Sequence, residues 1–150
     1  MLFRSNALIS SAKTAVSTVY EKMSEYRVAD ALDAVWSLLR RSNKYIDETT
    51  PWILGKDESQ KDRLGTVMYN LVESIRISAV LLSPFMPDTA NKILKQLNIF
   101  ENKDLISSAS IESFGNYPKN TSISSFEPLY MRLDEKVVMD EINKHFESLA

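Results

Sequence analysis

The chain has 150 residues, of which 44% are hydrophobic and 25% charged, and its formal net charge is −2. It contains no cysteine, which excludes disulfide frameworks, thiolate zinc sites and cysteine nucleophiles. Its one histidine, His145, lies five residues before the C-terminal end, so a self-contained enzyme would lack its usual general base. We therefore predict one globular domain with no catalytic residue and no metal site.

No segment has the pattern of a secretory signal or a membrane span. The longest apolar run, 77–86, is interrupted by two serines and a proline and reaches about half the length needed to cross a bilayer. The lack of cysteine fits a reducing compartment. We expect a cytoplasmic protein with no membrane partner.

Glycine and proline are absent from residues 1–50, which leaves a long stretch free to form helix. The spacing of apolar residues predicts helices over 5–24, 27–48, 59–83, 87–97 and 134–148, with a turn or single helical turn over 51–57. Pro51 and Pro84 end the second and third helices, because the residue before a proline avoids the helical conformation. Trp36 lies in the middle of the second apolar stripe and is predicted to be a core residue.

Residues 99–133 have a different character. Serine and threonine become frequent, one glycine and two prolines interrupt the segment, and helical periodicity disappears. We expect an irregular tail that packs on the bundle or on another domain. The predicted fold is all-α: an antiparallel helical bundle over 1–98, this irregular C-terminal tail over 99–133, and a final helix over 134–150.

One basic and aromatic patch, around the end of the second predicted helix, points to a ligand. Its residues are Arg40, Arg41, Asn43, Lys44, Trp52 and Lys56. Cations that follow phosphates beside an exposed ring suit single-stranded nucleic acid. The same residues also suit a structural role, in which the cations complement the helix dipole and Trp52 covers the core. Spacing alone favours the structural role.

Two longer blocks resemble a known family. The run 31–56, ALDAVWSLLRRSNKYIDETTPWILGK, and the run 81–90, LLSPFMPDTA, closely resemble the anticodon-binding domain of bacterial methionyl-tRNA synthetases. The likeness covers about residues 6–98 and resumes at 128–134, PLYMRLD, where the family usually reads PLFPRID. Two blocks at a plausible separation are far more specific than a short motif.

The resemblance implies a partner, the anticodon loop of methionine tRNA, and a set of binding residues. In that family the tryptophan after the proline stacks on an anticodon base, which implies this role for Trp52, with Pro51 setting its approach. The residues with an implied backbone or positioning contact are Arg41, Asn43, Lys44 and Lys56.

The family's Asn-Leu-x-x-Arg motif and the His-Ile-Gly-His motif of its nucleotide-binding domain do not occur here. We therefore expect a fragment that starts downstream of both motifs, is inactive alone and binds no cofactor. The resemblance implies that the full-length ligase uses ATP and magnesium, and that the catalytic domain of the same chain is a partner. Two alternatives stay open: the anticodon-binding bundle of another class I aminoacyl-tRNA synthetase, and a helical protein-interaction module without RNA binding.

Overall fold

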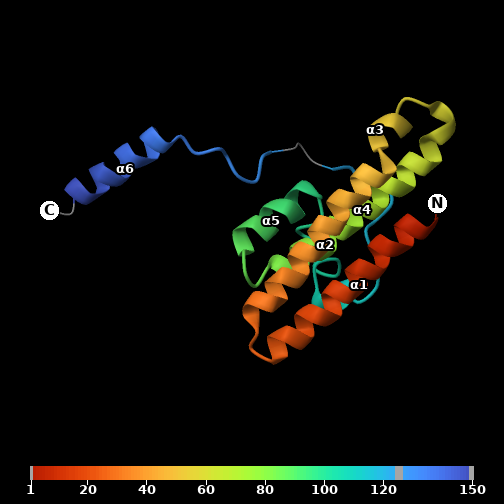
Figure 1. Cartoon of the computed structure of the whole chain (residues 1–150), viewed down its shortest axis with the longest axis horizontal. Coiled ribbons are helices and arrows are strands. Elements are labelled where there is room, and N and C mark those ends of the chain that lie inside the picture. The colour runs from red at the N-terminus through yellow and green to blue at the C-terminus, as the bar shows by residue number, and fades with distance from the viewer. Residues whose placement is uncertain (1, 124–126, 149–150) are drawn as a thin grey trace.

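A computed structural model of the chain describes residues 2–123 and 127–148, and most of these residues are helical (Figure 1). The α-helices are α1 (Leu2–Ser24), α2 (Val28–Thr49), α3 (Pro51–Leu54), α4 (Lys61–Leu82), α5 (Pro87–Gln96) and α6 (Glu135–Glu147), and the 3₁₀ helices are η1 (Glu58–Gln60) and η2 (Ser108–Ile111). No strand occurs in the described ranges, and the predicted all-α class is confirmed. Each predicted helix boundary lies within three residues of the observed one.

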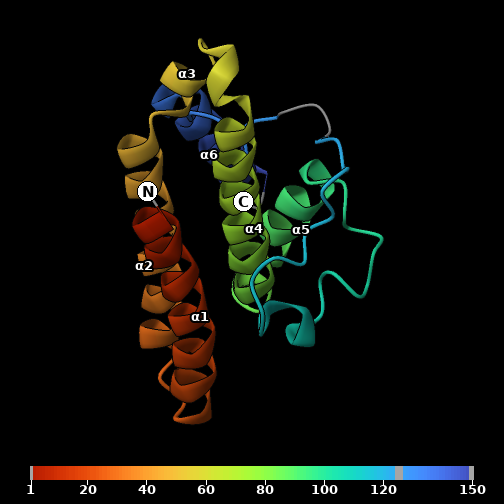
Figure 2. The ribbon, with the colours of Figure 1, turned by 90° about the vertical axis from the view of Figure 1, so that its right-hand side faces the viewer.

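Three long helices, α1, α2 and α4, form the centre of the bundle. α1 and α2 make an antiparallel hairpin, α4 runs alongside both, and α5 packs on α4 (Figure 2). The main core contains Leu8, Ala12, Val16, Ala31, Val35, Leu38, Leu71, Ile77 and Leu81. α6 lies apart from the bundle and none of its residues is buried (Figure 1).

Within residues 2–123 and 127–148, no helix is long and apolar enough to cross a membrane. The same residues include no group of three or more histidine, cysteine, aspartate or glutamate side chains that could hold a metal ion.

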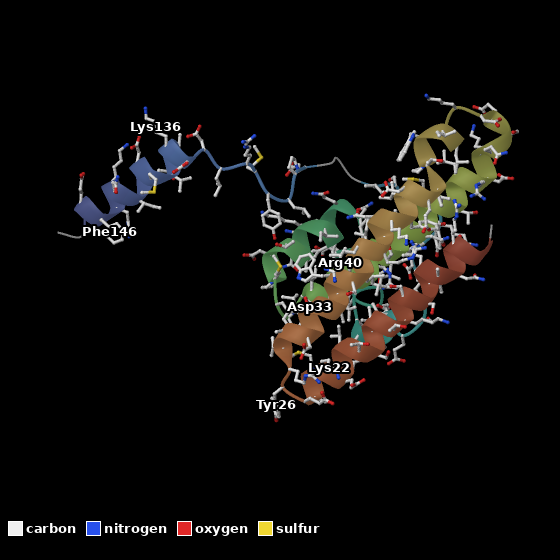
Figure 3. The ribbon with its side chains drawn as sticks, in the orientation of Figure 1. Lys22, Tyr26, Asp33, Arg40, Lys136 and Phe146 are labelled. Carbon is white, nitrogen blue, oxygen red and sulfur yellow. The ribbon has the colours of Figure 1, made fainter. Side chains whose placement is uncertain are left out.

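The hairpin turn between α1 and α2 is centred on Tyr26, which has a left-handed conformation with φ of 61°. The Arg27 N–H donates to the Lys22 carbonyl at 2.8 Å. This bond closes the last turn of α1, as is common where a left-handed residue such as Tyr26 follows a helix. Tyr26 lies at the tip of the hairpin (Figure 3). The chain therefore reverses sharply at this point, and α2 runs back along α1.

The prediction that Trp36 is a core residue is wrong, because its side chain is 37% exposed. The buried residues of α2 are Ala31, Val35, Leu38, Ser42, Tyr45 and Thr49. Trp36 lies about 100° around the helix from Val35, at the edge of this buried face. The apolar stripe in the sequence is thus wider than the surface that the neighbouring helices cover.

A fully buried ion pair on α4 holds the segment that follows α5. The Nε and Nη2 atoms of Arg76 donate to the two carboxylate oxygens of Glu73, each at 2.8 Å. Arg76 also donates to the carbonyl of Leu105 at 2.6 Å and to the carbonyl of Ser110 at 3.0 Å. The guanidinium therefore ties α4 to two points of the segment.

Glu73 completes this attachment from the other side of the pair. Its carboxylate accepts hydrogen bonds from three successive main-chain N–H groups, those of Gly115, Asn116 and Tyr117, at 2.8 to 3.1 Å. A second apolar cluster joins α4 and α5 to the same segment and includes Val72, Ala79, Leu94, Leu97, Ile99 and Tyr117. Residues 99–117 are thus packed on the bundle, while the division of the chain into units at 98 and 133 stays a prediction.

Two tyrosines in this second cluster should make the protein sensitive to alkaline pH. Burial raises the pKa of Tyr69 and of Tyr117 above the ordinary value of 10.0. As pH rises past 10 the unfolded chain releases these protons first, so we expect the free energy of unfolding to fall from that pH upward. Urea denaturation at a series of pH values should show a shallower fall for Tyr117→Phe. Parallel curves for the two proteins would contradict the expectation.

Candidate nucleic-acid interface

The junction between α2 and α3 places an aromatic residue at one end of the bundle. Thr50 joins the two helices in a left-handed conformation, with φ of 44°, and its N–H donates to the Ile46 carbonyl at 2.8 Å. Pro51 then begins α3 with a φ that suits the first position of a helix. A β-branched residue in the left-handed region is strained, and such strain gathers at functional sites. The bend makes α3 start on a new axis instead of extending α2.

Trp52 projects from this bend with 55% of its side chain exposed. Its side chain makes no hydrogen bond to another described residue. Leu54, at the end of α3, packs against the main core and anchors the short helix. The ring is therefore presented to solvent on a fixed turn.

The predicted cations lie around α2 and α3 on more than one face. Arg40 and Lys44 are exposed on α2, with Arg40 labelled in Figure 3, and Lys56 is exposed just after α3. Residues two apart on a helix point about 200° from each other, so Arg41 and Asn43 lie on opposite flanks of α2. The structure therefore does not bring these two side chains together.

Arg41 points toward α1 and is held by several contacts. Its Nη2 donates to Glu48 Oε2 at 2.9 Å and to the Arg4 carbonyl at 3.3 Å. Arg4 in turn donates from its guanidinium to the main-chain carbonyl of Glu48. The Arg41 guanidinium lies 6.0 Å from the ring centroid of Tyr45. These contacts fix the orientation of Arg41 at the end of the bundle where α3 and the N-terminus of α1 also lie (Figure 1).

Arg4 and Glu48 also belong to this arrangement, and the sequence motifs did not predict them. A signal for their proximity exists in the sequence, because each lies 22 residues from Tyr26, the centre of the hairpin turn. Antiparallel helices of equal rise place such residues level with each other. Only the observed turn position, however, identifies the pair.

A family model described as the anticodon-binding domain of tRNA ligase matches residues 5–149. The chain belongs to this family. It is 44% identical over 139 residues to the methionine–tRNA ligase of Clostridium acetobutylicum, a match that covers 93% of this chain and 21% of that protein. It is 43% identical over 129 residues to the methionine–tRNA ligase of Bacillus subtilis, which covers 86% of this chain and 19% of that protein. The chain spans about a fifth of the length of these curated relatives.

Solved structures agree with this family. The free-state methionyl-tRNA synthetase of Mycobacterium tuberculosis superposes with a TM-score of 0.79 at 28% identity, over 87% of this chain and 26% of that chain. The same synthetase in complex with methionyl-adenylate gives a TM-score of 0.78 at 29% identity, over 86% and 25%. The bundle is therefore the fold found in these synthetases.

Proposed function

We propose that this chain recognises the anticodon loop of methionine tRNA as the anticodon-binding part of a methionine–tRNA ligase. The family match over residues 5–149 supports anticodon binding, and the names of the relatives support methionine as the amino acid. The structural observation that carries the proposal is the 55% exposed ring of Trp52, held on a proline-initiated turn beside cations.

The proposed mode of binding assigns different tasks to the ring and to the polar side chains. Proteins read RNA loops by unstacking bases, stacking them on aromatic rings and bonding to their exposed edges. One anticodon base stacks on Trp52, and Pro51 fixes the angle of the ring. Exposed Asn43, Lys44 and Lys56 contact the backbone and position the loop. A rigid bundle presents these groups with little ordering cost.

In a ligase of this kind, recognition at the anticodon selects the tRNA for a reaction elsewhere. Contacts made only with the correct anticodon hold the acceptor end in the catalytic domain of the same chain, so part of their binding energy can lower the chemical barrier. ATP and Mg²⁺ would bind in that catalytic domain, and residues 1–150 would hold neither a cofactor nor a catalytic residue. The proposed compartment is the cytoplasm.

The proposal is tested by comparing two anticodon stem–loops that differ only in the anticodon. One carries CAU, complementary to the methionine codon, and the other carries GAU with the same stem. We expect the chain to bind the CAU stem–loop about tenfold more tightly, a difference of the size that one mismatched base pair causes at a protein–DNA site, about 1–3 kcal/mol. Fluorescence anisotropy at low salt measures both dissociation constants.

The other outcomes identify the alternatives. Equal affinity for both stem–loops would overturn methionine recognition, and a preference for another anticodon would assign the bundle to a different class I synthetase. No binding at any ionic strength would favour a protein-interaction module, because RNA binding through cations must strengthen as salt falls.

A further inference from the structure

A small hollow lies between α1 and α2. It is near the start of α1, at the end of the bundle that also carries α3. It has a volume of about 280 Å³ and is lined by Arg4, Ala7, Arg41, Lys44 and Glu48. We call it the arginine hollow. Three cations face a single carboxylate there, so the hollow is electropositive in a chain whose net charge is −2.

One hydrogen-bond donor in the arginine hollow has no partner. Arg41 Nη2 is bonded to Glu48 and to the Arg4 carbonyl, but Arg41 Nη1 is buried and has no hydrogen-bond acceptor among the described residues. A buried donor without an acceptor costs stability, and native proteins satisfy almost all of them. An acceptor from outside the chain would satisfy this nitrogen.

A phosphate has the chemistry to be this acceptor. A guanidinium presents N–H groups in a planar fork that matches phosphate oxygens, and the ammonium of Lys44 adds charge beside it. Glu48 holds Arg41 in place before any ligand arrives, which lowers the ordering cost of binding. Lys44 makes no ion pair within the described part of the chain, so its charge is available.

We propose that the arginine hollow binds one backbone phosphate of the tRNA, with Arg4, Arg41 and Lys44 as its ligands. The proposal rests on the proposed function, because it takes the tRNA as the source of the phosphate. Arg41 lies about 12 Å along the helix axis from the end of α2, at a rise of about 1.5 Å per residue. An RNA strand whose base stacks on Trp52 reaches the hollow within a few nucleotides.

The test measures how the affinity for the CAU stem–loop depends on salt. In the double variant Arg4→Gln/Lys44→Gln, two exposed cations of the hollow are lost. We expect binding about tenfold weaker at low salt, and a slope of log Kd against log salt that is smaller by up to about 0.7, the contribution of one neutralised phosphate. The preference for CAU over GAU should be unchanged, because phosphate contacts do not read bases.

A matched control removes the same charge from the other end of the hairpin. Lys22→Gln/Arg27→Gln also loses one lysine and one arginine. Lys22 lies beside the α1–α2 turn (Figure 3), and the Arg27 N–H donates to its carbonyl. Its salt slope should stay close to that of the unmodified chain. Urea denaturation of each variant checks that folding is retained.

Arg41→Lys tests the unpartnered nitrogen itself. Lysine keeps the positive charge but has no second nitrogen to reach the phosphate. We expect about tenfold weaker binding with an unchanged salt slope. Binding equal to that of the unmodified chain would overturn the role of Arg41.

The outcomes separate this proposal from the one on which it rests. If the unmodified chain binds CAU preferentially and both double variants show the same salt slope, the phosphate site is overturned and anticodon recognition stands. If the unmodified chain shows neither binding nor preference for CAU, the proposed function itself fails.

Discussion

Replacing Trp52 by alanine should weaken binding of the CAU stem–loop by about 10-fold to 100-fold, since stacking of a base on an aromatic ring contributes about 1–3 kcal/mol. The ring is 55% exposed and bonds to no other described residue, so its removal takes little from the folded structure. We therefore expect the free energy of unfolding to change by about 0.5 kcal/mol or less, as for most surface substitutions. Anisotropy measures the affinity, and urea denaturation measures the stability.

Two further variants make this result specific. Trp52→Phe keeps a flat ring and should retain most of the affinity. Trp36→Ala removes the other tryptophan, which lies in the middle of α2 and is 37% exposed, and should leave RNA binding unchanged. Equal losses in Trp52→Ala and Trp36→Ala would show that the stacking surface is not at Trp52.

Most of the helices could be predicted from the positions of proline residues, which break helices, and from the spacing of apolar residues. Pro51, Pro84 and Pro87 lie at helix boundaries in the sequence, and they lie at or beside helix boundaries in the structure. Proline acts locally, through its missing N–H and its fixed φ, so its effect needs no knowledge of tertiary contacts. The turns after α1 and after α5 lack proline and depend instead on residues in the left-handed conformation, Tyr26 and Asn98, which composition does not reveal.

The packing of residues 99–117 could not be predicted in the same way. These residues follow no helical period because they are held by side chains of α4, above all Glu73 and Arg76, and not by their own main-chain ladder. In the sequence nothing about these two charges indicates that they are buried. Their burial follows only once the segment lies over them and supplies the main-chain partners that a buried charge requires.

The sequence predicted which residues belong to the candidate site but not how they are arranged. Trp52, Lys44 and Lys56 are exposed near one end of the bundle, as a binding surface requires. Arg41 differs, because its position on α2 turns it toward α1, where Arg4 lies. Arg4 is 37 residues away in the sequence, and no local pattern links the two. Contacts between α1 and α2 thus hold Arg41 in a fixed orientation. Trp52, Lys44 and Lys56 stay exposed.

The largest loss of stability should come from Glu73→Gln on α4. The variant keeps the size of the side chain but leaves the Arg76 guanidinium buried without its counter-charge. Removing one partner of a buried pair typically costs about 3–5 kcal/mol, a large share of the roughly 5–15 kcal/mol that holds a domain together. The carboxylate also accepts from the N–H groups of residues 115–117, so hydrogen exchange at these amides should accelerate.

An exposed pair of the same helical spacing provides the control. Arg27 and Asp30 lie three residues apart, like Glu73 and Arg76, but both are exposed to solvent. Asp30→Asn makes the same carboxylate-to-amide change and should leave the denaturation midpoint almost unchanged, because water replaces the lost interaction. The double variant Glu73→Gln/Arg76→Met should cost less than the sum of its two single variants, since it removes the unpaired charge. Equal effects of Glu73→Gln and Asp30→Asn would mean that the buried pair does not hold residues 105–117 on the bundle.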